Sequence, residues 1–271
     1  MVQPFFSLVI LCYKGGNAIV PFIEKAHRLL GDYNFPWEII LVANYMEGVE
    51  DPTPEVMRNI AKKLNNCRVL TLSKKGMMGW DLRSGMSVAR GEYVGVIDGD
   101  GQFPIEALAS CLAKIRLEGL DLVKTYRVRR DDGLYRKLIS IVYNFLFRML
   151  GFGDLKDANS KPKVIRRVKF EEMRLCADDW FVDAEIMIKA HRMGLKVKEI
   201  PIHFSAQTDR CSYVKPSAIF EFIKNLLAAR NGRFGRPNHD TFDGLGLNKL
   251  PHSLKRDATE SNRNDGKSLF E

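Results

Sequence analysis

The sequence lacks the residue patterns that build disulfide frameworks and zinc sites. Its five cysteines, at positions 12, 67, 111, 176 and 211, are odd in number, widely spaced and without a CxxC pair. This excludes a zinc ribbon and a disulfide-stabilised scaffold, and it is typical of the reducing cytosol. The five histidines include no HExxH pair, so metal chemistry by histidine is not expected.

Long apolar runs are also missing. The longest ones, such as 143–147 and 219–223, end at Arg148 and Lys224, far short of the about 20 residues that span a bilayer. The first residues form a strand pattern and not a basic stretch followed by an apolar one, so we expect no export signal. The chain is therefore expected to lie in the cytoplasm and not to cross a membrane by itself.

Two phosphate-binding glycine motifs are absent. There is no GxxxxGK[ST] loop, and no GxGxxG follows the first expected strand, which argues against a P-loop ATPase and a dinucleotide-binding dehydrogenase. What is present is the composition of a soluble globular protein: 271 residues, 45% of them hydrophobic and 28% charged. The net charge of +9 indicates an anionic partner, which is a nucleic acid, an anionic lipid or a phosphorylated substrate.

In the first half of the chain, short β-rich runs alternate with helical patterns. The expected strands are 5–11, 37–42, 68–72, 93–97 and 121–125, and the expected helices are 17–30, 54–64, 79–89 and 104–117. This order predicts the α/β class, with a doubly wound, mostly parallel sheet. Ligands of such sheets bind outside the carboxyl ends of the strands.

The second half is expected to end in amphipathic helices. A basic, amphipathic helix is expected over 131–150, although a core helix with solvated arginines fits the same pattern. A helix over 184–193, a strand over 196–203 and a second amphipathic helix over 216–230 follow. We expect one domain over 1–235 and a polar, disordered tail over 236–271, because the tail has few large apolar residues.

The segment YVGVIDGDGQFP, residues 93–104, carries the clearest chemistry. Alternate residues of an extended chain point the same way, so Asp98 and Asp100 can present both carboxylates on one side. Oxygen ligands of this kind suit Mg²⁺ or Mn²⁺. An EF-hand also begins with DxD, but it needs Gly and Glu where this chain has Phe103 and Ala109. The pattern predicts a divalent-cation site at a strand end.

This segment resembles the DxDxQ signature of the inverting, GT-A-fold glycosyltransferases of family 2, in their polyprenyl-phosphate (dolichol-phosphate mannose synthase-like) branch. The resemblance covers about residues 5 to 230 in order. The other matching segments are 6–13 (FSLVILCY), 72–90 (LSKKGMMGWDLRSGMSVAR), 124–136 (KTYRVRRDDGLYR), 157–163 (DANSKPK), 181–185 (FVDAE) and 209–215 (DRCSYVK).

The resemblance implies a nucleotide-diphosphate sugar as donor and a metal, Mg²⁺ or Mn²⁺, on the donor diphosphate. Asp98, Asp100 and Gln102 would hold the metal, which stabilises the charge that grows on the leaving group. The implied donor-binding residues are Leu11, Tyr13, Asn44, Gly79, Arg83 and Asp98. In this set Tyr13 would stack on the base, Leu11 and Asn44 would contact it, and Gly79 would let the backbone approach.

The resemblance also implies a polyprenyl phosphate as acceptor, at the inner face of a membrane. Its phosphate would be bound by Arg127, Arg136 and Ser140, because arginine forks match phosphate oxygens, with Arg210 and Lys215 as a basic lid. A phosphate monoester is already largely dianionic at neutral pH and needs no general base, whereas a sugar hydroxyl does. Asp183 is the candidate base for the hydroxyl case, and its alternative role is to complement the helix dipole.

Three departures from the family pattern point to a divergent subfamily whose donor need not be GDP-mannose. Residues 43–45 (ANY) replace the usual DDGS, whose acidic residue contacts the base, residues 161–162 (KP) replace Gly-Phe, and Cys211 replaces a frequent Gly. The remaining alternatives are a glycosyltransferase with a saccharide hydroxyl as acceptor, a nucleotidyltransferase, and a basic nucleic-acid-binding protein. The basic residues between the fifth expected strand and the next helix, among them Arg127 and Arg136, adjoin an apolar helix and not a row of exposed aromatic side chains. We therefore expect a membrane surface or a membrane protein as partner, and no nucleic acid.

Overall fold

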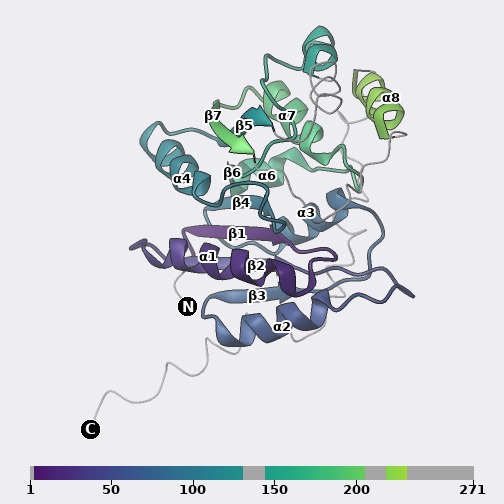
Figure 1. The fold of residues 1–271 in the computed structure, drawn as a ribbon. Helices are drawn as coiled ribbons and strands as arrows, with labels where there is room; N and C mark the ends of the chain where they lie inside the picture. Colours follow the sequence, from purple (N-terminus) through teal and green to yellow (C-terminus); the bar gives the residue numbers. More distant parts are fainter. Residues whose placement is uncertain (1–2, 131–143, 205–217, 231–271) are drawn as a thin grey trace.

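A seven-stranded sheet forms the centre of the protein (Figure 1). The computed structural model describes residues 3–130, 144–204 and 218–230. The strands are β1 (Phe6–Leu11), β2 (Trp37–Val42), β3 (Cys67–Leu70), β4 (Tyr93–Asp98), β5 (Leu122–Arg130), β6 (Lys163–Arg166) and β7 (Val197–Phe204). They lie in the order β3-β2-β1-β4-β6-β5-β7. Only β6 runs antiparallel to its neighbours within this sheet, β4 and β5.

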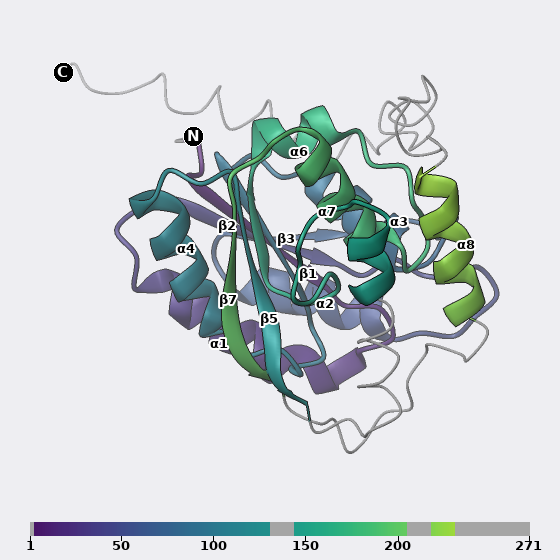
Figure 2. The same ribbon diagram turned by 90° about the horizontal axis from the view of Figure 1, so that it is seen from above.

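Helices cover both faces of the sheet (Figure 2). They are the 3-10 helix η1 (Gly16–Ile19), α1 (Val20–Gly31), α2 (Thr53–Lys63), α3 (Met78–Ser87), α4 (Ala107–Leu117), α6 (Arg167–Met173), α7 (Val182–Arg192) and α8 (Ala218–Arg230), and residues 144–149 are also helical. Side chains of α1, α2 and α4 pack in one apolar cluster, and those of α3, α6, α7 and α8 pack in another. The predicted doubly wound α/β sheet is confirmed.

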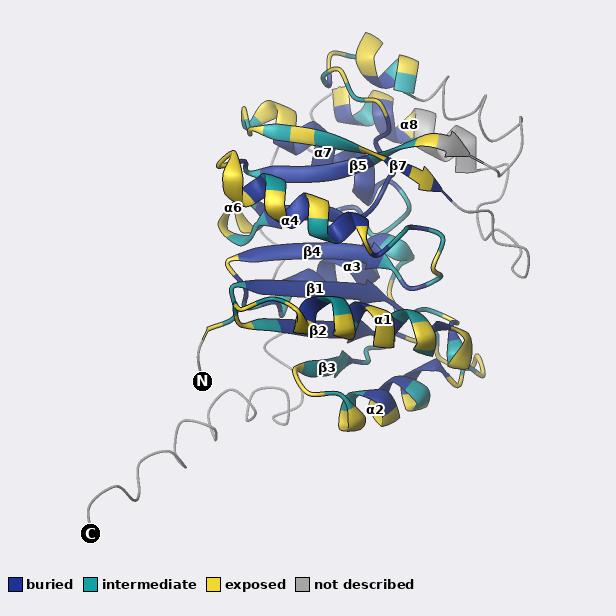
Figure 3. Cartoon of the chain, turned by 60° about the vertical axis from the view of Figure 1, so that its left-hand side comes forward, coloured by how far each residue is buried: buried dark blue, intermediate teal, exposed yellow. Residues whose placement is uncertain are grey.

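The two apolar clusters follow from the alternation of side chains along the strands. In β1, Val9 and Leu11 belong to the cluster under α3 and α7, while Leu8 and Ile10 belong to the cluster under α1 and α4. A strand with helices on both faces is expected to be mostly apolar, and β1 (FSLVIL) is so apart from Ser7, whose hydroxyl donates to Glu38. Figure 3 shows the central strands as buried and the exposed positions on the outer sides of the helices.

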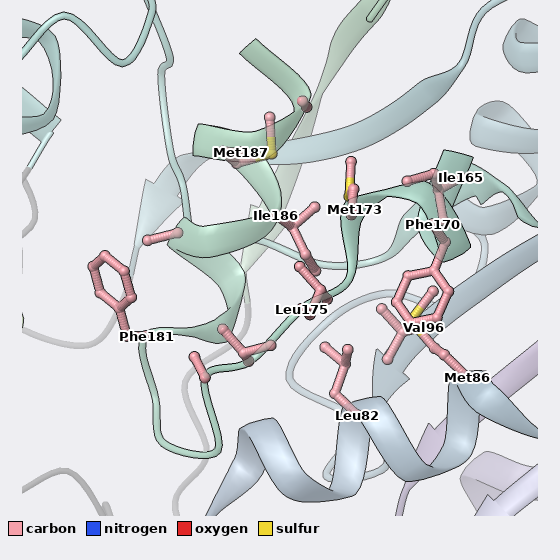
Figure 4. Close-up of a cluster of buried hydrophobic side chains, with 14 of the residues drawn as sticks. Leu82, Met86, Val96, Ile165, Phe170, Met173, Leu175, Phe181, Ile186 and Met187 are labelled. Atoms are coloured by element: carbon pink, nitrogen blue, oxygen red, sulfur yellow. The ribbon is translucent and has the colours of Figure 1, made fainter. Parts of the chain in front are cut away.

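The cluster on the α3 and α7 side connects the two halves of the chain (Figure 4). Leu82 and Met86 of α3 lie in it together with Phe170 of α6 and Ile186 of α7. All four side chains are at most 4% exposed. The two helices that flank the loop 174–181 are therefore packed in one cluster with α3.

The structure confirms the five strands expected in the first half to within three residues at each end, apart from the C-terminal end of β5, which extends to Arg130. Two elements were not expected, β6 and α6. The strand β6 was missed because it has only four residues, KVIR, with a charge at each end. The predicted tail, 236–271, and most of the predicted helix 131–150 lie outside the described residues. Among the helices of the described ranges, none is long and apolar enough to cross a bilayer.

Candidate active site

The predicted donor-site residues meet at the carboxyl edge of the sheet. The parallel register pairs Leu11 with Val42 on one side and with Asp98 on the other, so the loops that follow β1, β2 and β4 lie next to each other. Because β6 is antiparallel to β4, its first residue, Lys163, pairs with Val96 near the end of β4. The loop before β6 is thereby brought to the same edge.

The DGDGQ loop begins as expected, directly at the end of β4. The Gly99 N–H donates to the Leu11 carbonyl oxygen over 2.9 Å, and the Gln102 N–H donates to Asp100 Oδ1 over 3.0 Å. Gly101 has a φ of +75°, a conformation that favours glycine. These bonds fold the loop back on itself and hold the Asp98 and Asp100 backbone at the sheet edge.

Asp98 is bound by a lysine that the sequence analysis treated only as a departure from the family pattern. The Lys161 ammonium lies 2.9 Å from Asp98 Oδ1 and 3.1 Å from Oδ2. It also lies 3.4 Å from Asp183 Oδ2, and Lys163 Nζ donates to Asp183 Oδ1 over 2.5 Å. Lys161 and Lys163 are each 1% exposed and Asp183 is 2% exposed. Asp98, Lys161, Asp183 and Lys163 thus form a continuous chain of ion pairs.

The charges in this chain stabilise each other. Burial by itself raises the pKa of Asp183, but the ammonium groups of Lys161 and Lys163 outweigh it and hold that pKa below its ordinary value. Burial likewise lowers the pKa of Lys161, but Asp183 and Asp98 raise it above the usual value. For Lys163, burial dominates and lowers the pKa to about 8 despite Asp183. Asp183 is therefore an ionised, enclosed carboxylate with two cationic partners.

The predicted base-binding residues lie around a second ion pair. The Tyr13 ring has the Lys74 ammonium 4.0 Å from its centroid, and Lys74 forms an ion pair with Asp81. Asn44 is completely buried: its amide nitrogen donates to Asp81 Oδ1 over 2.8 Å and to Ser84 Oγ over 3.0 Å. Its Oδ1 accepts the Leu72 N–H. The Asn44 amide is thus used to position Asp81 and the backbone near β3.

The structure gives Gly79 and Arg83 protein partners in place of an exposed binding surface. A Cβ on Gly79 would lie 2.3 Å from the Ala177 carbonyl oxygen, so this glycine allows α3 to approach the loop between α6 and α7. Arg83 forms an ion pair with Asp178 of that loop. Glu185 fixes the loop further, because its carboxylate accepts the N–H groups of Cys176 and Ala177. The approach expected of a ligand at Gly79 is made here by the chain itself.

Of the predicted acceptor residues, the structure describes Arg127. Its Nε and Nη2 donate to the Asp157 carboxylate over 2.6 and 2.8 Å, and its guanidinium lies 5.2 Å from the centroid of Phe204. Arg136, Ser140, Arg210 and Lys215 lie outside the described residues. Lys161, Lys74, Asp81 and Asp157 are the neighbours that sequence reasoning gave no role. For Lys161, one feature of the sequence indicated a special role: a lysine stands where the family usually has glycine.

The donor set at the end of β4 fits a divalent cation. Asp100 and Gln102 offer carboxylate and amide oxygens, the hard ligands that Mg²⁺ and Mn²⁺ prefer. Within the described ranges, no group of three or more His, Cys, Asp or Glu side chains could hold a metal by itself. A cation at this loop would therefore complete its coordination with water and with oxygens of a bound diphosphate.

Comparisons with known proteins show the family of the chain. Residues 7–174 match the model of Glycosyl transferase family 2, and the chain belongs to that family. It is 26% identical over 219 residues to a dolichyl-phosphate beta-glucosyltransferase of Trichomonas vaginalis, covering 74% of this chain and 66% of the relative. It is 25% identical over 248 residues to a dodecaprenyl-phosphate galacturonate synthase of Rhizobium johnstonii, covering 89% and 71%. The chain thus spans about two thirds of the length of these relatives.

Solved structures confirm the fold as GT-A. Mannosyl-3-phosphoglycerate synthase from Rubrobacter xylanophilus superimposes with a TM-score of 0.66 at 18% identity, covering 88% of this chain and 78% of that one. Glucosyl-3-phosphoglycerate synthase from Mycobacterium tuberculosis, in complex with Mn²⁺, UDP-glucose and phosphoglyceric acid, has a TM-score of 0.62 at 16% identity, with coverages of 87% and 81%. At this identity the likeness is one of fold.

Proposed function

We propose that this protein is an inverting glycosyltransferase that moves a sugar from a nucleotide-diphosphate sugar to a polyprenyl phosphate at the cytoplasmic face of a membrane. The family match supports glycosyl transfer. The names of the two relatives, one acting on dolichyl phosphate and one on dodecaprenyl phosphate, support a polyprenyl-phosphate acceptor.

The setting of Asp183 is the observation that carries the choice of acceptor. A saccharide hydroxyl must lose a proton in the reaction, and Asp183 was the candidate to take it. Asp183 is 2% exposed, forms ion pairs with Lys161 and Lys163, and has a lowered pKa, all of which make it a poor base. A phosphate monoester needs no base because it is largely dianionic at neutral pH.

The donor side rests on the loop after β4. Asp100 and Gln102 would hold Mg²⁺ or Mn²⁺, which when bound neutralises the donor diphosphate as the sugar leaves. Asp98, held by Lys161, would fix the shape of the loop around it. Tyr13 would stack on the base, with the Lys74 ammonium near its ring strengthening that surface, while Asn44 keeps Asp81 and Lys74 in place.

The acceptor side is proposed to lie at the end of β5. Arg136, Ser140, Arg210 and Lys215 remain our candidates for the acceptor phosphate. The Arg127 guanidinium is hydrogen-bonded to the Asp157 carboxylate. Arg127 would therefore hold the end of β5 in place as well as contact the phosphate. The pairing also keeps the Arg127 guanidinium oriented, which a flexible arginine would not be.

Apolar side chains in the helical segments 144–149 and α8 support peripheral membrane attachment. Phe145, Met149 and Leu227 are 53%, 66% and 51% exposed, and the basic residues Arg148 and Arg230 belong to the same segments. Exposed apolar side chains next to basic ones are the composition of helices that lie in the interface of an anionic membrane.

Isothermal titration with GDP, UDP and their sugar conjugates, with and without Mn²⁺, tests the donor half of this proposal. We expect one nucleotide to bind in a Mn²⁺-dependent way, and its sugar conjugate to define the donor. If no nucleotide binds, and an oligonucleotide binds tightly and in a salt-sensitive way, the nucleic-acid alternative replaces the glycosyltransferase.

A further inference from the structure

Lys161 places a buried positive charge on one of the two carboxylates that the metal motif provides. Its ammonium contacts both Asp98 oxygens, at 2.9 and 3.1 Å, and the Met78 sulfur at 3.1 Å. The lysine side chain is 2% exposed, whereas that of Asp98 is 25% exposed. The ammonium therefore contacts Asp98 from the interior of the protein, and the exposed part of the Asp98 carboxylate faces the site.

A cation already bound at Asp98 changes what the carboxylate can do for a metal. A divalent ion ligated by Asp98 would sit at about 2.1 Å from an oxygen and hence within about 5 Å of the Lys161 ammonium, where the two positive charges repel each other. Both oxygens are also hydrogen-bonded, and the ammonium neutralises the carboxylate.

We propose that Lys161 is a resident cation of the donor site, which withholds Asp98 from the metal and leaves Asp100 as the only carboxylate ligand from the DGDGQ loop. Lys161 is in this sense a positioning residue that acts through Asp98. The metal then binds weakly to the protein alone, and it binds tightly together with a diphosphate that supplies the missing oxygens. Metal and nucleotide are expected to raise each other's affinity by the same factor.

The chain offers a matched control in Lys163. It is as buried as Lys161, at 1% exposed, and contacts the same Asp183, but it is bonded to the Ser160 carbonyl oxygen in place of Asp98. Replacing either lysine by Met removes one buried ammonium from the same network. Only the Lys161 substitution releases Asp98.

The test is the affinity of the full chain for Mn²⁺ alone, measured from the electron paramagnetic resonance signal of the free aqueous ion. We expect Lys161→Met to bind Mn²⁺ about 10- to 100-fold more tightly than the wild type, the range that partners of metal ligands typically control. Lys163→Met should stay near the wild-type affinity. Adding Asp98→Asn to Lys161→Met should abolish the gain.

Two results would overturn the proposal. One is a folded Lys161→Met protein that binds Mn²⁺ no more tightly than the wild type, or whose gain survives Asp98→Asn. The other, which decides the question if Lys161→Met does not fold, is a protein with Lys161→Met and Asp98→Asn together, in which the net charge of the pair is unchanged, that loses as much Mn²⁺ affinity as Asp100→Asn. The inference rests on the metal-binding part of the proposed function, but the titration contains no donor or acceptor, so a failure of glycosyl transfer would not imitate its failure.

Discussion

Arg127 and Asp157 form a two-point ion pair, with Nε 2.6 Å from Oδ2 and Nη2 2.8 Å from Oδ1. The pair connects β5 to the loop that leads to Lys161, so it helps to hold Lys161 in position. Burial raises the pKa of the Asp157 carboxyl, but the Arg127 guanidinium outweighs it and brings that pKa down to about 2. Because the folded-state pKa lies below the ordinary value, the pair stabilises the fold above about pH 4.

The first prediction concerns this stability. The shift of the Asp157 pKa from 3.8 to about 2 corresponds to about 2 kcal/mol at neutral pH. We expect Asp157→Asn to lose about this free energy of unfolding in urea at neutral pH, and the difference from the wild type to shrink as the pH falls from about 4 toward 2. The exposed pair of Arg167 and Glu171 is the control, and Glu171→Gln should change little. Equal losses at neutral and acid pH would contradict the role of the charge.

A second prediction follows from the contact between α3 and the loop after α6. A Cβ at Gly79 would lie 2.3 Å from the Ala177 carbonyl oxygen, so Gly79→Ala forces the two apart. We expect it to cost about 1–3 kcal/mol in free energy of unfolding. Gly31, at the end of α1, has nothing within 4 Å of its added Cβ, and Gly31→Ala should be tolerated. If Gly79→Ala were as stable as Gly31→Ala, the close approach would not exist in solution.

The third prediction concerns Asn44, which stands where the family has an acidic residue. Asn44→Asp would face the buried carboxylate of Asp81 across the present 2.8 Å hydrogen bond, and burial already raises the Asp81 pKa despite Lys74. We therefore expect Asn44→Asp to destabilise the protein by about 3–5 kcal/mol at neutral pH. Asn44→Ala, which only loses hydrogen bonds, should cost about 1–3 kcal/mol. Urea unfolding that ranks Asn44→Asp as the more stable variant would contradict this.

The fourth prediction concerns the proton in the reaction. With a phosphate as nucleophile, kcat/KM should fall at acid pH as the acceptor phosphate takes up its second proton, with a midpoint at about pH 6. Asp183→Asn should keep that fall even if it lowers the rate by loosening Lys161 and Lys163. If the fall disappears in Asp183→Asn while the protein remains folded, Asp183 is a base after all and the acceptor is a hydroxyl.

The fifth prediction concerns the metal ligand. Asp100→Asn should reduce turnover almost completely and leave the circular dichroism spectrum unchanged, because Asp100 lies in a partly exposed loop outside both apolar clusters. Chelation of divalent cations from the wild type should have the same effect and should be reversed by Mn²⁺. Undiminished turnover in Asp100→Asn would remove the metal from the mechanism.

The fold was largely predictable because the central strands β1, β2 and β4 are buried on both faces and read as bounded, mostly apolar runs. The Asp98–Lys161 contact was not predictable, because the two residues are 63 positions apart and a lysine in a sequence normally indicates an exposed charge. Lys161 and Lys163 flank a proline in a short, charged segment, a pattern that indicates an exposed loop. The sequence therefore predicted neither the burial of the two lysines nor the strand β6. Asn44 could be identified as unusual from the sequence, but its partner Asp81 is an unremarked residue of α3.

The acceptor is the central claim, and it is tested most directly by presenting the purified protein with its donor and two lipids that differ only in the phosphate, a short polyprenyl phosphate and the corresponding polyprenol. Mass spectrometry of the extracted lipid should find one added sugar on the polyprenyl phosphate in the presence of Mn²⁺, and none on the polyprenol. Transfer to the alcohol, or to a free saccharide and not to the lipid phosphate, would contradict the proposed function.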